Sequence, residues 1–269
     1  MPTGVCKLCL LDRELLASHY LPAGVFSQLR VKSKENPNPV LITKEVTLTS
    51  SRQPKDFVLC AECEERFNEN GERWVLANMA REESFHLQAF LSAQGPIDQN
   101  EDFAIFAGAK IQSVNIDALV YFAMSIFWRS SIHSWPGITS RTEQLNLREF
   151  LEPIRQFLLG GKFPQNAAIF ITVWPKLDVP RIAYTPREGE APGYRVFNFM
   201  IPGIEFRLFL GSAIPPVLFQ TCAQQSELRC IFSSTKLISE TRDTLIKLAR
   251  GSRIAKNLRE DWPPRIDET

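Results

Sequence analysis

Two cysteine pairs constrain this chain more than any other feature of its sequence. The first pair lies in residues 6–9 (CKLC) and the second in residues 60–63 (CAEC), with fifty residues between them. Each C-x-x-C segment presents two thiolates on one tight turn, and two facing turns form the tetrahedral sulfur cage that structural Zn²⁺ prefers. A coincidental set of core cysteines is the alternative. The spacing favours a zinc site with the ligands Cys6, Cys9, Cys60 and Cys63.

Length and composition limit the number of domains, the kinds of partner and the cellular location that we expect for this protein. The chain has 269 residues, 44% of them hydrophobic, which suffices for one large domain or two ordinary ones. A net charge of +1 provides no long-range attraction to nucleic acid or acidic lipid, so nucleic-acid contact requires a local patch. The N-terminus lacks a secretion signal and no apolar run could cross a bilayer, which predicts a cytoplasmic protein without membrane contact. The isolated Cys222 and Cys230 are expected in the core.

A polar, turn-rich stretch between residues 93 and 101 predicts a domain boundary. We expect a zinc-binding domain over residues 1–93 and a second domain over residues 101–269. In the first domain, residues 64–79 have helical spacing that Asn70-Gly71 is expected to break or kink. Shorter elements are expected there as a helix at 23–30 and strands at 40–42 and 46–48.

The second domain has a different pattern. Its first helix, 115–131, is too uniformly hydrophobic for a surface position, and its second, 145–159, is amphipathic with a kink expected at Pro153. A last helix is expected over about 240–258. Segments rich in β-branched and aromatic residues predict strands at 168–174, 181–184, 194–201 and 204–210. This pattern predicts an antiparallel sheet flanked by helices.

A histidine motif lies between the two cysteine pairs. It reads Ser18-His19-Tyr20-Leu21-Pro22, and the second pair lies in the segment LCAECEERF of residues 59–67. The order C-x-x-C, S-H-x-x-P and L-C-x-x-C-E-x-x-F resembles the bacterial zinc-knuckle branch of the HNH (ββα-metal) endonuclease family over roughly the first 80 residues. The resemblance implies a treble-clef-like zinc ββα domain, and hence an α+β fold class for the chain. It also implies metal-dependent hydrolysis of phosphodiester bonds in DNA, with RNA as the less favoured substrate.

The resemblance assigns roles to individual residues. The family's general base falls on His19, which would take a proton from the attacking water. The positions that hold the family's catalytic Mg²⁺ or Mn²⁺ fall on Ser18 and Glu64. Ser18 stands where the family has Asp or His, and Glu64 stands where it has His or Asn. The Asn that orients the family's histidine has no clear counterpart here, and Asp56 is the nearest polar residue.

The residues themselves leave structural alternatives open. His19 can hydrogen-bond the backbone of a knuckle turn instead of acting as a base. Trp128 and Trp135 flank Arg129 and His133, and we expect them to pack in the core rather than to stack on a nucleobase. Arg129 would then cap the helix end or pair with a carboxylate. An acidic cluster follows the second cysteine pair and comprises Glu64, Glu65, Glu69 and Glu72. Its negative charge would complement the N-terminus of the helix, or part of it would hold a metal with His19.

A basic segment near the C-terminus is the candidate contact with nucleic acid. Between residues 242 and 259, Asp243 is the only acidic residue among six basic ones. A basic helix contacts phosphates without reading sequence, and a solvated terminal helix is the alternative. The residues expected at this interface are Lys247, Arg250, Arg253, Lys256 and Arg259.

Two hypotheses of function follow. The first is a metal-dependent HNH-like endonuclease that cuts DNA and, by family analogy alone, serves in bacterial or phage-related defence. The second is a catalytically inactive descendant that keeps the zinc scaffold as a binding module. In that case it would bind nucleic acid, or a protein partner through residues 101–269.

Overall fold

The computed structural model describes residues 1–30, 38–42, 46–49, 53–135, 144–176, 182–251 and 253–254. The strands are β1 (Thr3–Val5), β2 (Asp12–His19), β3 (Val40–Ile42), β4 (Val46–Thr49), β5 (Lys55–Cys60), β6 (Asp98–Gln99), β7 (Phe103–Ala107), β8 (Ala167–Val173), β9 (Tyr184–Gly189), β10 (Arg195–Ile201), β11 (Ile204–Leu210), β12 (Cys230–Ser234) and β13 (Arg253–Ile254). The α-helices are α1 (Ala23–Leu29), α2 (Ala61–Phe67), α3 (Arg73–Asn78), α4 (His86–Gln94), α5 (Ile116–Ile132), α6 (Leu151–Leu158), α7 (Pro216–Thr221) and α8 (Thr235–Gly251). A π-helical turn, η1 (Asn68–Glu72), joins α2 to α3, and 3₁₀ turns lie at Gly108–Lys110 and Arg148–Phe150.

The N-terminal segment is a small three-stranded sheet followed by a helix. Its strand order is β1-β2-β5, with both pairings antiparallel. The register of β2 and β5 places Leu15 opposite Cys60 and His19 opposite Lys55. Helix α2 begins at Ala61, directly after β5, so the second cysteine pair lies at a strand–helix junction. The α+β class predicted from the sequence is confirmed.

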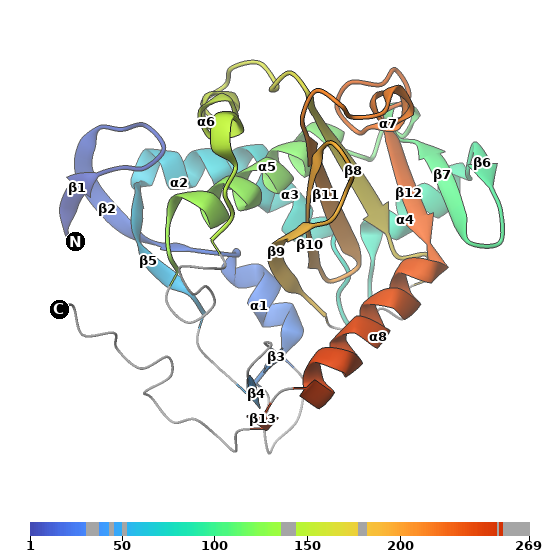
Figure 1. The fold of residues 1–269 in the computed structure, drawn as a ribbon, viewed down its shortest axis with the longest axis horizontal. Helices are drawn as coiled ribbons and strands as arrows, with labels where there is room; N and C mark the ends of the chain where they lie inside the picture. The colour runs from blue at the N-terminus through green and yellow to red at the C-terminus, as the bar shows by residue number, and fades with distance from the viewer. Residues whose placement is uncertain are drawn as a thin grey trace.

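The second sheet has seven strands in the order β6-β7-β12-β8-β11-β10-β9 (Figure 1). The pairs β8–β11, β11–β10 and β10–β9 are antiparallel, as the sequence predicts. The prediction of a purely antiparallel sheet is wrong, because β12 runs parallel to β8, with Phe232 opposite Thr172. Three strands and α7 lie between β8 and β12 in the chain, which gives the connection enough length for a parallel crossover.

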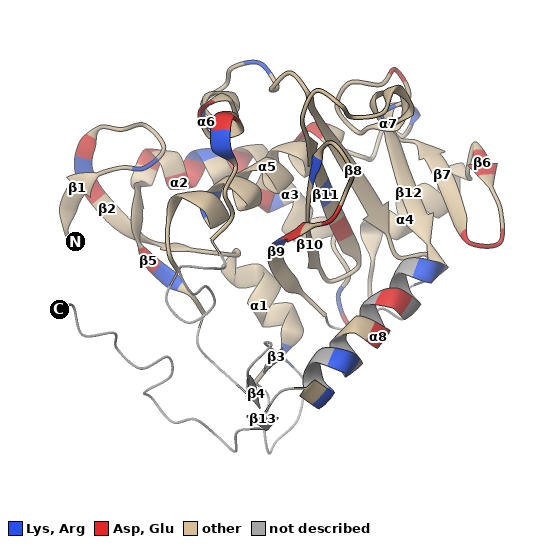
Figure 2. Cartoon of the chain, viewed as in Figure 1, with Lys and Arg blue, Asp and Glu red and all other residues tan. Residues whose placement is uncertain are grey.

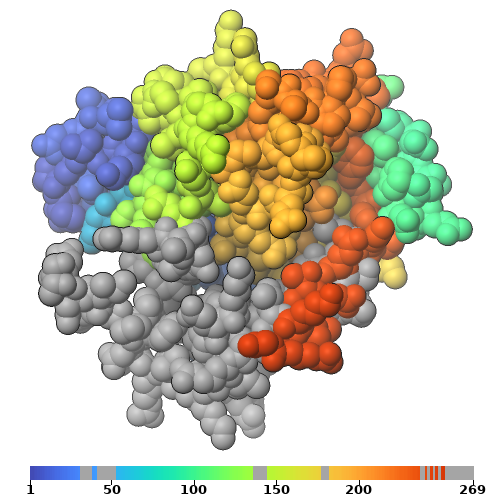
Figure 3. Space-filling model, in the orientation of Figure 1, coloured from blue at the N-terminus to red at the C-terminus, as the bar shows by residue number. Residues whose placement is uncertain are grey.

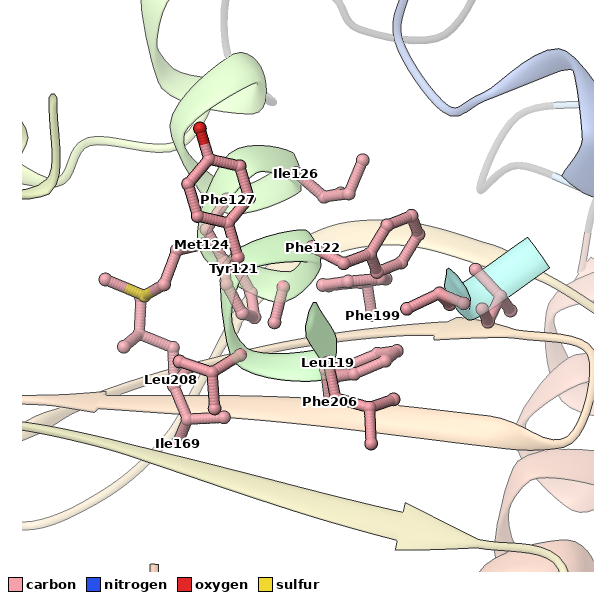
Figure 4. Close-up of a cluster of buried hydrophobic side chains, with 14 of the residues drawn as sticks. Leu119, Tyr121, Phe122, Met124, Ile126, Phe127, Ile169, Phe199, Phe206 and Leu208 are labelled. Carbon is pink, nitrogen blue, oxygen red and sulfur yellow. The ribbon is translucent and has the colours of Figure 1, made fainter. Parts of the chain in front are cut away.

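Helix α5 packs on one face of the seven-stranded sheet and forms the centre of the core (Figure 4). The ring centroids of Phe122 and Phe206 are 5.6 Å apart, and those of Phe127 and Phe199 are 5.0 Å apart. Every α5 residue from 118 to 130 is buried. The uniform hydrophobicity of this helix therefore reflects its position, since a helix enclosed by protein has no solvent-exposed face.

A break or kink is expected at Asn70-Gly71, and the helix does change there, from α-helical to π-helical, but α2 and α3 are continuous through this turn. Gly71 is buried against α5, where a Cβ atom would lie 2.9 Å from the backbone nitrogen of Phe122. Glycine allows this close approach, and the wider π turn accommodates it without ending the helix. Buried side chains of the predicted first and second domains belong to one cluster. The division into two domains stays a prediction.

Three element boundaries differ from those expected. Helix α6 begins at Leu151, so Pro153 lies in its first turn. A backbone N–H in the first turn has no intrahelical acceptor, so the proline removes no hydrogen bond and causes no kink there. Strand β9 starts at Tyr184 rather than ending there. Helix α8 ends at Gly251 and is followed by β13, so the helix expected as far as residue 258 is too long.

The N-terminal hairpin and the β6–β7 hairpin lie at opposite ends of the face seen in Figure 3. None of the helices in the described ranges combines the length and the apolar character that crossing a bilayer requires.

Candidate metal centre

Four sulfur atoms meet between the first hairpin and the start of α2. The Sγ atoms of Cys6, Cys9, Cys60 and Cys63 all lie within 4.8 Å of one another, and those of Cys9 and Cys60 are 3.9 Å apart. A tetrahedral zinc with Zn–S bonds of about 2.3 Å holds its sulfurs about 3.8 Å apart. The four-cysteine group is therefore consistent with a structural zinc.

The thiols interact strongly with one another. A hydrogen bond with Cys63 lowers the pKa of the Cys6 thiol to about 4. The same hydrogen bond, followed by burial, raises the pKa of Cys63 above its usual range, and burial raises that of Cys60. Thiolates this close repel one another, so a divalent cation is what would hold all four deprotonated together.

Backbone hydrogen bonds fix the first cysteine turn. The C=O of Cys6 accepts from the N–H of Leu10 at 2.9 Å, and Leu10 adopts a left-handed φ of 61° that closes the turn. The N–H of Cys60 donates to Sγ of Cys6 at 3.3 Å, and such a contact orients and stabilises a metal-binding thiolate. Arg155 of α6 donates to the C=O of Leu8 at 2.6 Å. Arg155 belongs to the second segment, the predicted domain of residues 101–269, so this segment also holds the turn.

Glu64 directly follows Cys63 in the chain, whereas His19 lies at the other end of the β2–β5 pairing from Cys60, opposite Lys55. His19 ends β2 and is half-buried, and Glu64 lies in the first turn of α2. Burial, and then the charge of Lys55, lower the pKa of His19 below its ordinary value of 6.5, while the charge of Glu64 acts in the opposite direction. The imidazole is therefore neutral at neutral pH. The Oε1 atom of Glu64 is buried and has no hydrogen-bond donor among the described residues.

Arg129 of α5 connects the second segment to this site. Its side chain is only 2% exposed and pairs with Glu72 of η1, with 2.5 Å between Nη2 and Oε1. Its Nη1 donates to the C=O of His19 at 3.3 Å. Arg129 thus pairs with a carboxylate, as the sequence indicates. Trp128 and Trp135 are fully buried, so they form no exposed stacking platform.

Ser18, considered as a metal ligand, and Asp56, considered as the residue that orients His19, both have other partners. Ser18 is 1% exposed, and its hydroxyl accepts from the N–H of Leu59 at 3.2 Å, where the pairing of β2 and β5 is irregular. Asp56 places its Oδ2 atom 2.9 Å from Nε2 of His133. Ser18 therefore serves the strand pairing, and Asp56 orients His133. The sequence offers no signal for the second contact, because the partners are 77 positions apart.

Three of the five residues expected to contact nucleic acid lie in the described part of the chain. Lys247 and Arg250 are exposed on α8, and Arg253 lies in β13, which pairs with β4. Lys256 and Arg259 lie outside the described residues. Acidic and basic positions both occur along α8 (Figure 2). The nucleic-acid interface stays a prediction.

Sequence reasoning missed two cations near His19. Lys55 lies opposite His19 because of the register in which β2 pairs with β5, and the local sequence does not specify that register. Arg129 was visible as a charge in an apolar helix, yet its partner Glu72 is 57 positions away and its contact with His19 spans 110 positions. Pairings of this kind arise from tertiary packing.

Comparison of the chain with protein-family models found no match, and comparisons with curated proteins and with solved structures found none either. The likeness to the HNH endonuclease family stays a prediction drawn from the cysteine and histidine motifs.

Proposed function

We propose that this protein is a metal-dependent, HNH-like endonuclease that hydrolyses phosphodiester bonds in DNA. The treble-clef-like N-terminal segment would carry the site, with zinc on the four cysteines in a structural role. The observation that carries the proposal is the buried Oε1 atom of Glu64, which has no hydrogen-bond donor among the described residues, in a carboxylate whose charge acts to raise the pKa of His19.

An unsatisfied buried polar atom costs roughly 1–3 kcal/mol, and more when it is charged. A divalent cation would satisfy the Glu64 carboxylate, and carboxylate oxygens are the ligands that Mg²⁺ and Mn²⁺ prefer. When bound, such an ion supplies Lewis-acid stabilisation of a phosphodiester's departing oxygen. The residues fit this role through Glu64 alone, since Ser18 and Glu72 are bound elsewhere in the structure.

His19 has the properties of a general base. Its lowered pKa keeps the ring neutral at neutral pH, so it can accept a proton from a water molecule. Lys55, opposite it on the neighbouring strand, supplies positive charge next to the position where a phosphate would lie. The roles are therefore proton acceptance by His19 and cation binding by Glu64.

A plasmid-nicking assay with Mg²⁺ or Mn²⁺ tests the proposal. His19→Ala and Glu64→Gln should each lower the nicking rate by about a hundredfold or more while bound zinc stays at the wild-type level. Glu65→Gln is the matched control, because Glu65 is exposed on the same helix and pairs with Arg73 at 3.1 Å. Wild-type rates in both site variants would refute the proposal.

The second candidate function is a zinc-scaffold binding module without catalysis. It is favoured by one observation, namely that the hydroxyl of Ser18 is used by the backbone of Leu59. Absence of nicking with either metal, together with DNA binding that weakens with salt and is lost in Lys247→Gln/Arg250→Gln, would support this reading. Stable capture of a single protein by residues 101–269, without DNA binding, would support a protein partner instead.

A further inference from the structure

We propose that Arg129, held by Glu72, is a positioning residue that fixes the end of β2 and with it the catalytic histidine. The inference rests on the proposed function and gives the second segment a role that the sequence did not reveal. Arg129 belongs to α5, whereas His19 belongs to the N-terminal segment that carries the four cysteines, the zinc segment. The site would therefore be complete only when both segments are packed together.

Three contacts fix the guanidinium of Arg129. Its Nη2 lies 2.5 Å from Oε1 of Glu72, its Nη1 donates to the C=O of His19 at 3.3 Å, and its Cζ lies 4.6 Å from the ring centroid of Phe67. Glu72 and Phe67 come from the continuous helix that begins at the second cysteine pair. One buried cation thus joins the helix that carries Glu64 to the strand that carries His19.

The backbone of Arg129 reaches the same strand end by a second route. The indole N–H of Trp135 donates to the C=O of Arg129 at 2.9 Å, and the Trp135 ring lies 5.4 Å from the ring of Tyr20. The N–H of Tyr20 in turn donates to the C=O of Pro54 at 3.0 Å, just before β5. The C-terminal turn of α5 therefore holds the chain at His19 and at the residue that follows it.

A purely structural account of this pair is weak on energetic grounds. Burying an Arg–Glu pair costs desolvation that its attraction barely offsets, and apolar residues of similar size often stabilise a core as well or better. What the pair adds is a fixed position for the groups that it contacts. A displacement of about 1 Å in a reacting group can cost about a hundredfold in rate, so fixing His19 has a direct catalytic value.

The test is a double variant, Arg129→Gln with Glu72→Gln, which leaves the net charge of the chain unchanged. It removes both buried charges together, so neither is left unpaired, but glutamine cannot hold the carboxamide of residue 72 and also reach the C=O of His19. The matched control is Arg195→Gln with Glu188→Gln, remote on the β9–β10 hairpin. Arg195 also pairs with a glutamate at 2.8 Å, contacts a backbone C=O, that of Asn146, and lies 4.8 Å from an aromatic ring.

The wild type and both double variants are compared in zinc content, thermal unfolding, and kcat and KM for plasmid nicking. The ring signals of histidine are followed by NMR as well, and the chain has only three histidines. We expect the Arg129 variant to hold zinc, keep KM, and lose tenfold to a hundredfold in kcat. Its His19 signals should shift while those of His86 stay in place. The control should match the wild type throughout.

The outcomes separate the two proposals. A wild-type protein that does not nick DNA refutes the proposed function, whereas a wild-type kcat and unshifted His19 signals in the Arg129 variant overturn only the positioning role. If the double variant fails to fold, Arg129→Lys replaces it, because a single ammonium keeps the buried charge but cannot bridge two acceptors as the planar guanidinium does. A folded Arg129→Lys protein with wild-type kcat also overturns the inference.

Discussion

Removing zinc from the four-cysteine group is expected to unfold both segments of this protein in one transition. A zinc bound by the four sulfurs would hold the turn at residues 6–9 against the strand–helix junction at residues 60–63. The side chains of Cys6, Leu8 and Cys60 are at most 2% exposed, so the turn is part of the core rather than a surface loop. Loss of the metal therefore opens the core itself.

The magnitudes decide the outcome. Structural zinc contributes apparent binding free energies of about 10–16 kcal/mol at neutral pH in small zinc-binding peptides. The whole stability of a folded protein is about 5–15 kcal/mol. The free energy of zinc binding is thus as large as the whole free energy of unfolding. Contacts between the segments pass the loss on, because Arg155 holds the C=O of Leu8 and Gly71 lies directly against Phe122.

The assay is a stepwise titration with a zinc chelator in reducing buffer. Zinc release is followed with a metal-sensitive dye, secondary structure by circular dichroism, and protection of the β8, β10 and β11 amides by hydrogen exchange. All three signals should change at the same chelator concentration. The variant Cys222→Ser/Cys230→Ser is the control, and it should keep one zinc per chain because neither cysteine belongs to the four-sulfur group.

The reasoning is refuted if the amides of β8, β10 and β11 stay protected after all zinc has been released. In that case the seven-stranded sheet would be independently stable, and residues 1–93 and 101–269 would behave as the two separate domains that the sequence predicts.

Three further predictions concern single residues. Gly71→Ala should lower the free energy of unfolding by about 1–3 kcal/mol in denaturant titrations, because the added Cβ would meet the backbone of Phe122 at 2.9 Å and neither helix can yield. Ser18→Ala should cost about 1–3 kcal/mol in the same titrations without changing the Mn²⁺ dependence of nicking, because its hydroxyl serves the backbone rather than a metal. Nicking should fall on acidification only below pH 6.5, because burial and Lys55 lower the pKa of His19 and the base must be neutral to accept a proton.

Each of these predictions has its own control or contrary result. Gly251→Ala should leave stability within about 0.5 kcal/mol, since nothing lies within 4 Å of the added Cβ. A weaker Mn²⁺ response in Ser18→Ala would return Ser18 to the metal site. A pH–rate midpoint above 6.5 would contradict the electrostatic surroundings of His19, in which Lys55 and Arg129 lower its pKa while Glu64 and Glu72 raise it.

Elements with strong local signals were predictable. The apolar run of α5, with Asn115 accepting from the N–H of Ala118 at its start, and the alternation in β11 both appear where the sequence places them. The short strands β3 and β4 also lie where the sequence places them, whereas β12 was missed. Strand β12 is five residues long and takes its place in the sheet from its neighbours β7 and β8, which the local sequence does not specify.

The sequence by itself determined the four-cysteine group, because the geometry of a C-x-x-C turn is local and two such turns need only meet. It also determined the α+β class and the helix at the centre of the core. Only the tertiary structure decided which side chains surround His19. The pairing of Arg129 with Glu72, the binding of Ser18 to Leu59, and the burial of a Glu64 oxygen that finds no donor within the described ranges depend on packing between segments distant in the chain. No local pattern specifies such contacts, because they arise only when β2 pairs with β5 and α5 packs against the N-terminal segment.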